Sequence, residues 1–510
     1  MAPYIRTPRK GRDERRSVQV IWSRKGGVTK MTQIGVAHTE EDLAVLMLEA
    51  EEVLAGGQGE LDLDFGDPAT TLAPRHSGRR LKSVGSKSEH LWQALQAACS
   101  ALDFDHAAGD RVFRDLVLAR VIEPTSKLQA IRVCAAAGYP TMSYKTIMRR
   151  LPLYSAERFR EALAAACAAH ARLGPKSLVL YDVSTLHFEI DEADEFRIPG
   201  YSKERRLEPQ IVIGLLTDVT GAPLMVNAFE GNKAETTTMI PTIKSFLTAH
   251  HLTEVVIVAD AGMVSDPNKQ AIEAEGLQYI IGAKLPHVPY QVETWRKNHP
   301  GEEPPDGLTL VQPGSGGGNT GRAKQTIFYQ YRAARARRSI KGIDTQMAKA
   351  ERMLQGNAKI KGNKYVSVSG GSKAIDRDLE HRHRVLAGWK AYVTNIPDPK
   401  ADFVIGSYHQ LFRIEKAFRM KKGDLRARPI FHKERDSIEA HLTIVFAALA
   451  VGHWIEAVTG LSIKKFVNSA KPVRTTYAQI GDHIIPVDDE IPPELAAALK
   501  AIKTKIAHPV

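Results

Sequence analysis

The hydrophobic pattern along the chain changes its period several times. The first 75 residues hold a strand-like run, VQVIW, and an acidic helix-like run from Glu40 to Leu54, followed by a Gly- and Asp-rich stretch. From Leu91 to Leu173, Ala-rich amphipathic segments alternate with Pro and Gly breaks, which predicts helices. We therefore expect an N-terminal module and linker over residues 1–75 and an N-terminal helical domain over 85–173.

Two neighbouring segments of the helical region have the pattern of a helix-turn-helix. SKLQAIRVCAAAG ends in a Gly turn, and TMSYKTIMRRL follows with Ser143 placed to cap a short helix. That helix would present Lys145, Arg149 and Arg150 to DNA. A purely structural helix pair is the alternative, because any two short helices joined by a Gly give this pattern.

From Lys176 the chain takes on the period of β-strands. Three strand-like runs come in succession, the last two joined by a turn at Thr220 and Gly221. An amphipathic helix, the strand VVIVA, a second helix and the strand YIIGA follow. The order β-β-β-α-β-α-β predicts an α/β domain with a mixed five-stranded sheet and flanking helices, which is the order of the ribonuclease-H-like fold.

The segment from 286 to 390 interrupts the strand pattern with Gly-rich and basic stretches, which predicts an inserted subdomain. The strand WKAYVTNI and a helix from Tyr408 to Met420 then complete the sheet domain, which would cover 176–285 and 391–465, with 466–510 as a C-terminal extension. The apolar run from Leu442 to Ile455 is shorter than the roughly 20 residues of a bilayer span, so we expect a core helix.

Length and charge narrow the class of protein. The 510 residues suggest about three domains, and 43% hydrophobic with 25% charged residues exclude a disordered, collagen-like or coiled-coil chain. Lys and Arg total 70 against 58 Asp and Glu, a formal net charge of +12. This excess favours a polyanionic partner such as nucleic acid.

The cysteines and the N-terminus indicate the compartment. The three cysteines, Cys99, Cys134 and Cys167, are far apart and lie among apolar residues, so we expect buried, reduced thiols and no Cys-based zinc site. The basic N-terminal segment has no apolar stretch behind it and is not a secretory signal. We expect a cytoplasmic protein that does not associate with a membrane.

Two carboxylates stand within or directly after apolar strands. Asp182 follows VLY in the first strand, and Asp260 follows VVIVA. Adjacent strands would bring both to one edge of the sheet, where a divalent cation offsets their repulsion and desolvation. The alternative is a pair of Asp residues that cap strand ends.

A third carboxylate, Glu415, lies in the predicted helix YHQLFRIEKAFRMKK. Helical spacing places it in one stripe with four other residues, namely Tyr408, Leu411, Arg419 and Lys422. An acid among bases suits a helix that holds a metal ion while its cations bind phosphates. A solvated basic helix is the alternative.

Several segments resemble the DDE transposases of bacterial insertion sequences: YDVSTLHFE, GYSKERRLEPQIVIGLL, FEGNKAETTT, VVIVADAGM, YHQLFRIEKAFRMKK and RPIFHKERDSIEAHLTIVFAAL. The resemblance spans most of residues 90–465. It is similar above all to the cut-and-paste group whose signature is Tyr, two residues, Arg, three residues, Glu, six residues, Lys. Tyr408, Glu415 and Lys422 fit this spacing, but Leu411 stands at the Arg position. Arg419 or Arg413 would replace that cation, and we favour Arg419.

The resemblance implies a site and a reaction. Asp182, Asp260 and Glu415 would be the DDE triad and would hold two Mg²⁺ ions, for which Mn²⁺ can substitute. The enzyme would cut double-stranded DNA at terminal inverted repeats and join the 3′-hydroxyl ends to target DNA. Tyr408 and Lys422 would position phosphates, the helical domain would recognise the element ends, and the DNA complex would contain a homodimer.

Two rival functions remain open at this point. A metal-dependent nuclease that cleaves without joining would share the triad, and terminal inverted repeats beside the gene would argue against it. A catalytically inactive DNA-binding protein derived from a transposase is the second rival, although all three acids are present.

Two weaker patterns add candidate contacts. Seven basic and no acidic residues lie from Arg322 to Lys341, interleaved with three aromatic residues, which suggests DNA contact by the insertion or, equally, a solvated helix face. KGGVTK at Lys25–Lys30 follows a strand as phosphate loops do, but it lacks their Gly-Lys-Ser/Thr order, so we do not expect nucleotide binding.

Overall fold

The structure is a computed structural model. It describes residues 4–8, 16–24, 27–37, 40–56, 82–140, 142–174, 176–188, 193–200, 208–250, 254–260, 266–313, 324–355, 363–369, 372–422, 434–480 and 483–508. Unit 1 comprises Met1–Ala94, Cys134–Pro140 and Lys465–Ala501, and unit 2 comprises Leu95–Val133, Thr141–Lys464 and Ile502–Val510. The six-segment division expected from the sequence stays a prediction.

Unit 1 begins with a small antiparallel sheet of order β1-β2-β3. Its strands are β1 (Tyr4–Arg6), β2 (Arg16–Arg24) and β3 (Gly27–Ala37), and α1 (Glu40–Gly56) packs on them around Val18, Val20 and Ala50. The strand and the helix predicted here are confirmed. Residues 27–30 of the KGGVTK segment begin a strand, whereas a phosphate loop leads into a helix, so the described part of that segment does not form one.

A second antiparallel sheet of unit 1 joins distant parts of the sequence. Its order is β16-β15-β4, formed by β4 (Lys82–Lys87), β15 (Thr475–Ile480) and β16 (His483–Asp488). Arg474 strengthens the junction, since its Nε donates to Ser86 Oγ at 2.9 Å and its Nη1 to Ser88 Oγ at 2.8 Å. The C-terminal extension is therefore paired with the segment that precedes the helical region.

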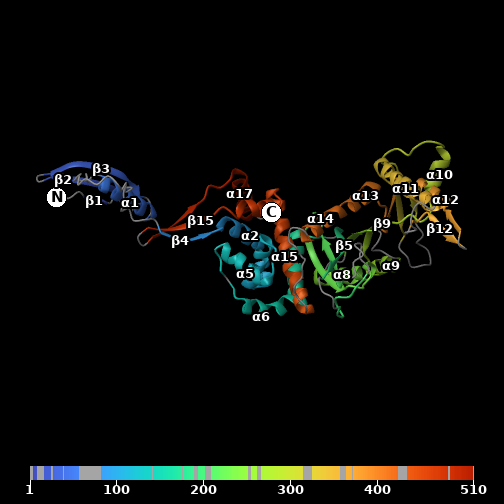
Figure 1. The fold of residues 1–510 in the computed structure, drawn as a ribbon, viewed down its shortest axis with the longest axis horizontal. Coiled ribbons are helices and arrows are strands. Elements are labelled where there is room, and N and C mark those ends of the chain that lie inside the picture. Colours follow the sequence, from blue (N-terminus) through green and yellow to red (C-terminus); the bar gives the residue numbers. More distant parts are fainter. Residues whose placement is uncertain are drawn as a thin grey trace. The chain divides into compact units, whose positions relative to one another are not determined.

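Unit 2 is built on one eight-stranded sheet of order β10-β11-β14-β9-β8-β5-β6-β7 (Figure 1). The strands are β5 (Ser177–His187), β6 (Gln210–Thr217), β7 (Pro223–Glu230), β8 (Val255–Ala259), β9 (Gln278–Ala283), β10 (Thr309–Pro313), β11 (Thr326–Tyr331) and β14 (Trp389–Thr394). The pairs β5–β8 and β8–β9 are parallel, and the other pairs are antiparallel.

The predicted mixed sheet is thus confirmed in type, but the predicted number of five strands is smaller than the eight strands found. All five predicted strands are present, the predicted returning strand forms β14 beside β9, and β11 and β10 extend the sheet beyond it. Two of these strands, β10 and β11, come from the segment predicted as an insertion. They join the sheet because the backbone groups of β11 pair with the returning strand β14 and those of β10 pair with β11. The predicted turn between β6 and β7 is also present, with Gly221 at a φ of +91°.

Three helices cover one face of this sheet: α7 (Glu157–Ala171), α8 (Glu235–His250) and α9 (Asp266–Ala274). Their apolar side chains form a common core with alternate residues of the strands, such as Val179 and Tyr181 of β5 and Ile257 of β8. The Tyr181 hydroxyl donates to Thr238 Oγ1 of α8 at 3.0 Å, so this buried hydroxyl is satisfied.

A long apolar helix, α15 (Arg435–Thr459), forms the centre of the helical region. It contacts α4 (Arg111–Ile122), α6 (Tyr144–Ser155) and α7. Its length and hydropathy would allow a membrane span, but 72% of its most apolar window is buried in the structure. The predicted core helix is therefore confirmed.

Six other helices are shorter than α15. They are α2 (Glu89–Ala101), α3 (Phe104–Ala108), α5 (Lys127–Ala136), α10 (Tyr290–Asn298), α16 (Ile463–Ala470) and α17 (Pro493–Ala507). The three cysteines on α2, α5 and α7 are buried free thiols, as predicted.

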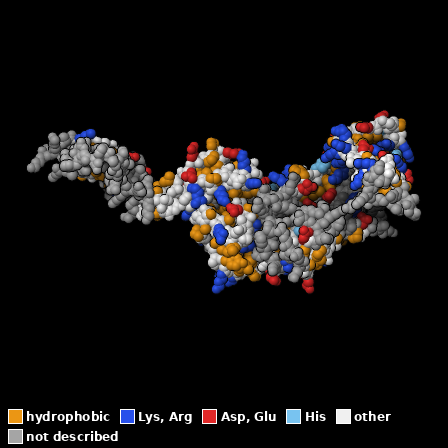
Figure 2. All heavy atoms as spheres, viewed as in Figure 1, with side chains coloured by type: hydrophobic (Ala, Val, Ile, Leu, Met, Phe, Trp, Pro, Cys, Tyr) orange, Lys and Arg blue, Asp and Glu red, His pale blue; other side chains and the backbone are white. Residues whose placement is uncertain are grey.

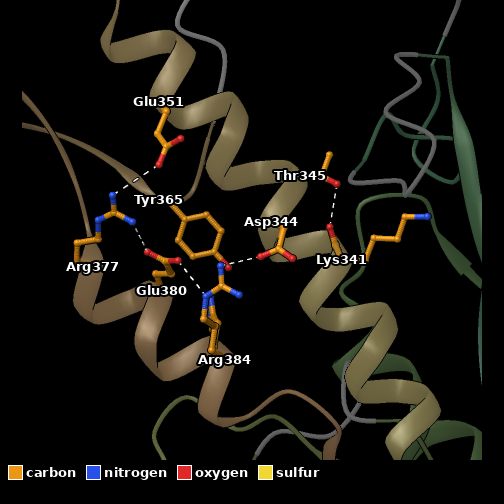
Figure 3. Close-up of polar contacts among 9 residues, drawn as sticks. Lys341, Asp344, Thr345, Glu351, Tyr365, Arg377, Glu380 and Arg384 are labelled. Carbon is orange, nitrogen blue, oxygen red and sulfur yellow. Dashed lines mark hydrogen bonds and ion pairs between the residues drawn. The ribbon is translucent and has the colours of Figure 1, made fainter.

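The inserted segment also carries α11 (Ala333–Leu354), α12 (Arg377–Val385) and the hairpin of β12 (Val366–Ser369) and β13 (Ser372–Ile375). Their small core contains Ile343, Met347 and Tyr365. A network of ion pairs joins α12 to α11 (Figure 3): Glu351–Arg377, Arg377–Glu380, Glu380–Arg384 and Arg384–Asp344. Lys and Arg side chains gather over these helices (Figure 2).

Candidate active site

The two strand-end carboxylates stand level with each other on adjacent strands. In the parallel pair of β5 and β8, Leu180 is opposite Val258. Asp182 and Asp260 each follow two residues later, so both side chains point to the same side of the sheet at the same height. This is the arrangement that the sequence predicted for them.

The acids lie on the sheet face opposite the core formed with α7, α8 and α9. Neighbouring residues of each strand, Tyr181 and Val183 of β5 and Ala259 of β8, point into that core. Because side chains alternate along a strand, Asp182 and Asp260 point away from it. Asp182 is half-buried, and its Oδ1 accepts a hydrogen bond from Val183 N at 2.8 Å.

Two consecutive helices, α13 (Ala401–His409) and α14 (Leu411–Lys422), lie on the same face as the acids. The first contacts β8, β9 and β14, and the second contacts β5. The sequence predicted one helix from Tyr408, whereas the structure breaks it at Gln410, which is the C-cap of α13. The break separates Tyr408 and Glu415 onto two helices that remain neighbours.

A glycine makes room for Tyr408 over the sheet. Gly282 of β9 carries no side chain, and a Cβ there would lie 2.6 Å from the Tyr408 hydroxyl oxygen. Tyr408 is buried, and its ring packs edge-on against Tyr392, with ring centroids 5.0 Å apart. Since Tyr392 is opposite Gly282 in the β14–β9 pair, the two tyrosines share one small space above these strands.

A chain of polar contacts runs through Tyr408. The Lys390 ammonium of β14 donates to the Tyr408 hydroxyl oxygen at 3.0 Å, and that hydroxyl donates to Asp260 Oδ1. Burial, and then the hydrogen bond to Asp260, raise the pKa of Tyr408, so the hydroxyl keeps its proton. Burial lowers the pKa of Lys390, while the negative charges of Asp260 and Glu415 oppose that shift.

Glu415 flanks the buried side of α14. The residues that anchor this helix are Leu411, Ile414 and Ala417, all buried, and Glu415 is exposed beside them. Its charge acts on both Tyr408 and Lys390. The structure therefore brings Asp260, Glu415 and Tyr408 together, with Asp182 level with Asp260 in the sheet.

The other predicted DNA contacts of this helix lie elsewhere or are not described. Leu411 is 9% exposed and serves as an anchor of α14. Arg413, two positions before Glu415, points to the other side of the helix and lines a cavity of about 360 Å³ with Thr220. The side chains of Arg419 and Lys422 lie outside the described residues.

The basic residues of the predicted helix-turn-helix lie on α6. Ser143 caps this helix and accepts a hydrogen bond from Thr146 N at 3.2 Å, as predicted. Lys145, Arg149 and Arg150 are exposed, and Arg150 lies 3.5 Å from Asp110. They belong to a different helix from the residues around Asp260, so a role for them in DNA binding stays a prediction.

The structure changes the reading of the basic run in the insertion. Phe328, Tyr329 and Tyr331 are 2–5% exposed because they lie within β11, inside the sheet. These rings therefore fill the core and cannot stack on bases. The basic residues of α11 are arranged as a typical exposed helix face, with Ile343 and Met347 on the buried side.

Lys390 lies at this site but was not predicted to do so. It belongs to the predicted returning strand WKAYVTNI, where it is the single charged residue among apolar neighbours. That is the same signal that singled out Asp182. A half-buried lysine in a strand is uncommon, because burying the ammonium costs free energy unless polar groups accept its protons.

The donor set suits a hard divalent cation. Asp182 and Asp260 offer carboxylate oxygens from one face of the sheet, and Glu415 offers a third carboxylate from α14; such ligands are typical of Mg²⁺ and Mn²⁺. In the described residues, no three His, Cys, Asp or Glu side chains are grouped closely enough to hold a metal ion as they stand. Binding would therefore require these side chains to turn toward one another.

Comparison with known proteins identifies the domain. A family model described as the transposase DDE domain matches residues 174–451, more than half of the 510 residues. The match includes Asp182, Asp260 and Glu415. A search of curated proteins finds no match.

Among solved structures, the chain is similar to that of piggyBac transposase in a synaptic complex with hairpin DNA. That comparison has 11% sequence identity and a TM-score of 0.37, and it covers 83% of this chain and 73% of the other. On the strength of the domain match, this chain belongs to the family of transposases with a DDE domain.

Proposed function

We propose that this chain is the transposase of a bacterial insertion sequence, of the cut-and-paste group with the Tyr-Arg-Glu-Lys signature. It cuts double-stranded DNA at terminal inverted repeats and joins the freed 3′-hydroxyl ends to target DNA. The observation that carries the proposal is the level placement of Asp182 and Asp260 on adjacent strands, in contact with the helices that bear Tyr408 and Glu415.

The three acids act as ligands of two Mg²⁺ ions, for which Mn²⁺ can substitute. When bound, such ions supply a water of lowered pKa and stabilise the charge on the leaving oxygen. Asp260 accepts a hydrogen bond from the Tyr408 hydroxyl and Asp182 from the amide of Val183, and on metal binding both carboxylates would turn toward Glu415. The exposed Glu415 leaves room for the DNA strand beside it.

The neighbouring polar groups position DNA. Lys422 and Arg419 contact backbone phosphates, with Arg413 as the alternative to Arg419. Tyr408, the other predicted phosphate contact, would have to give up its hydrogen bond to Asp260 to donate to a phosphate. The exposed Lys145, Arg149 and Arg150 of α6 contribute to recognition of the element ends. Two copies of the chain form a homodimer in the DNA complex, and the protein acts in the cytoplasm without a membrane.

The test uses labelled duplexes that cover the DNA on either side of the coding sequence. The wild type is expected to nick one strand at an element end with Mg²⁺, to fail with chelator, and to yield joined products when target DNA is added. Asp260→Ala should bind the duplex but neither cut nor join it. Cleavage by Asp260→Ala at the wild-type rate would contradict the assignment of the triad.

The same experiment separates the two rival functions. Metal-dependent nicking without any joined product would identify a nuclease. Binding without cutting in both Mg²⁺ and Mn²⁺ would identify an inactive DNA-binding protein. The position of the cut reports the boundary of the terminal inverted repeat.

A further inference from the structure

We infer that Lys390 binds a backbone phosphate of the DNA at this site and supplies a cation beside Asp260, in a chain whose transposase signature has Leu411 in place of Arg. The inference rests on the proposed function, because it assumes that the phosphate of a DNA strand lies beside Asp260. It concerns a residue outside the signature, on β14.

The strand register puts Lys390 on the face that bears the acids. Tyr392 is opposite Gly282, over which Tyr408 lies, and Lys390 is two residues before Tyr392 on the same side of β14. The intervening Ala391 packs in the core between β11 and α10. Lys390 therefore points toward α13 and α14.

The contacts of Lys390 hold its ammonium at the acids. The nitrogen lies 3.0 Å from the Tyr408 hydroxyl oxygen and 4.1 Å from the centroid of the Tyr408 ring. The charged groups that act on it are Asp260, Glu415 and Arg335. A half-buried ammonium on a flexible stem is a compact point charge with three donors, of which the described contact with Tyr408 uses one.

Position 411 cannot supply the cation. Leu411 is buried as an anchor of α14, and Arg413 lines the cavity on the other side of the helix with Thr220. Lys390 lies on β14 and contacts Tyr408 of α13, whereas α14 packs on β5.

The experiment measures DNA binding without metal. The probe is a blunt duplex of the flanking DNA, titrated in chelator at several salt concentrations. Lys390→Gln is expected to weaken binding about tenfold and to lower the slope of log K against log salt by about one, as the loss of one phosphate contact does. Lys390→Arg should retain the wild-type slope, because the charge is kept.

A matched control is Lys244→Gln. Lys244 lies on α8, on the opposite face of the sheet, and pairs with Glu275 at 2.7 Å. The control should keep the wild-type slope, and thermal unfolding should show that all variants are folded. A folded Lys390→Gln protein with the wild-type slope would overturn the inference.

The outcome for Lys390 is separable from that of the proposed function. If the wild type cuts and joins DNA with Mg²⁺ while Lys390→Gln binds as the wild type does, the transposase proposal stands and the role of Lys390 falls. If the wild type neither cuts nor joins, the proposed function falls, and with it the inference.

Discussion

The hydroxyl of Tyr408 donates a hydrogen bond to Asp260, which ties α13 to the end of β8. This contact depends on the absence of a side chain at Gly282, because the tyrosine lies directly over that residue. A buried tyrosine that donates to an exposed aspartate keeps one carboxylate oxygen fixed. The orientation of Asp260 is therefore set by a helix that follows it by more than a hundred residues in the chain.

Filling the space at Gly282 should displace Tyr408. In Gly282→Ala the new Cβ would lie 2.6 Å from the hydroxyl oxygen, so we expect a loss of about 1–3 kcal/mol in the free energy of unfolding, together with reduced cleavage. Gly342→Ala, on α11 with no atom within 4 Å of the added Cβ, should instead stabilise the chain by about 0.5–1 kcal/mol. Denaturant unfolding measures both, and a neutral Gly282→Ala would contradict the close packing of Tyr408.

The two strand carboxylates should act as one unit. Asp182→Asn and Asp260→Asn are each expected to reduce DNA cleavage by more than about 100-fold, and the double variant should be little worse than either single one, because both act on the same reaction. Single-turnover cleavage of a labelled duplex measures this. Asp266→Asn at the exposed start of α9 is the matched control and should cleave normally. If the cleavage rate of the double variant were reduced by the product of the two single reductions, the two carboxylates would act independently.

Lowering the pH should destabilise the inserted segment around His383. Its Nδ1 lies 2.9 Å from the hydroxyl oxygen of the buried Tyr365, and burial, followed by Lys364 and Arg382, lowers its pKa below 6.5. The folded state therefore favours the neutral ring, and stability is complete above about pH 6.5 and falls as the pH drops below it. The protection factors of the α12 amides, which correct exchange rates for the pH dependence of intrinsic exchange, should fall from about pH 7.5 to pH 5.5. His383→Gln should remove most of that change, and an equal change in the variant would rule out His383 as its source.

The ion pairs of the insertion should stabilise it modestly and in a salt-dependent way. Glu380 accepts from Arg377 Nη1 at 2.7 Å and from Arg384 Nε at 2.9 Å, which lowers the pKa of Glu380 (Figure 3). Glu380→Gln should lower the free energy of unfolding by at most about 1 kcal/mol at low salt. The loss should be smaller in about 1 M salt, since ions screen the pairs. Glu275→Gln, which breaks the surface pair with Lys244, should cost less at low salt. Unfolding curves at both salt concentrations test this, and a salt-independent loss would point to packing.

Much of the fold of unit 2 follows from local patterns. The runs that became β5, β8 and β9 are apolar and bounded by turn or cap residues, and the long apolar helix α15 was predicted as core, because periodicity and hydropathy report local conformation and burial. The large mixed sheet with helices agrees with the predicted α/β class, and membership of the DDE family implies the ribonuclease-H-like fold. The same local pattern also identified Asp260, an exposed carboxylate that directly follows an apolar strand.

What the sequence could not decide was pairing between distant segments. That β10 and β11 extend the sheet, and that Tyr329 is consequently buried, depends on hydrogen bonds to β14 across the insertion. The place of Lys390 at the acids likewise depends on the register of β14 against β9 and on the packing of α13 over Gly282. The sequence by itself determined the strands β5, β6, β7, β8 and β9 and where their acids stand, because these follow from local side-chain period. Only the tertiary structure decided which side chains meet, because that is set by strand register and by close packing between segments far apart in the chain.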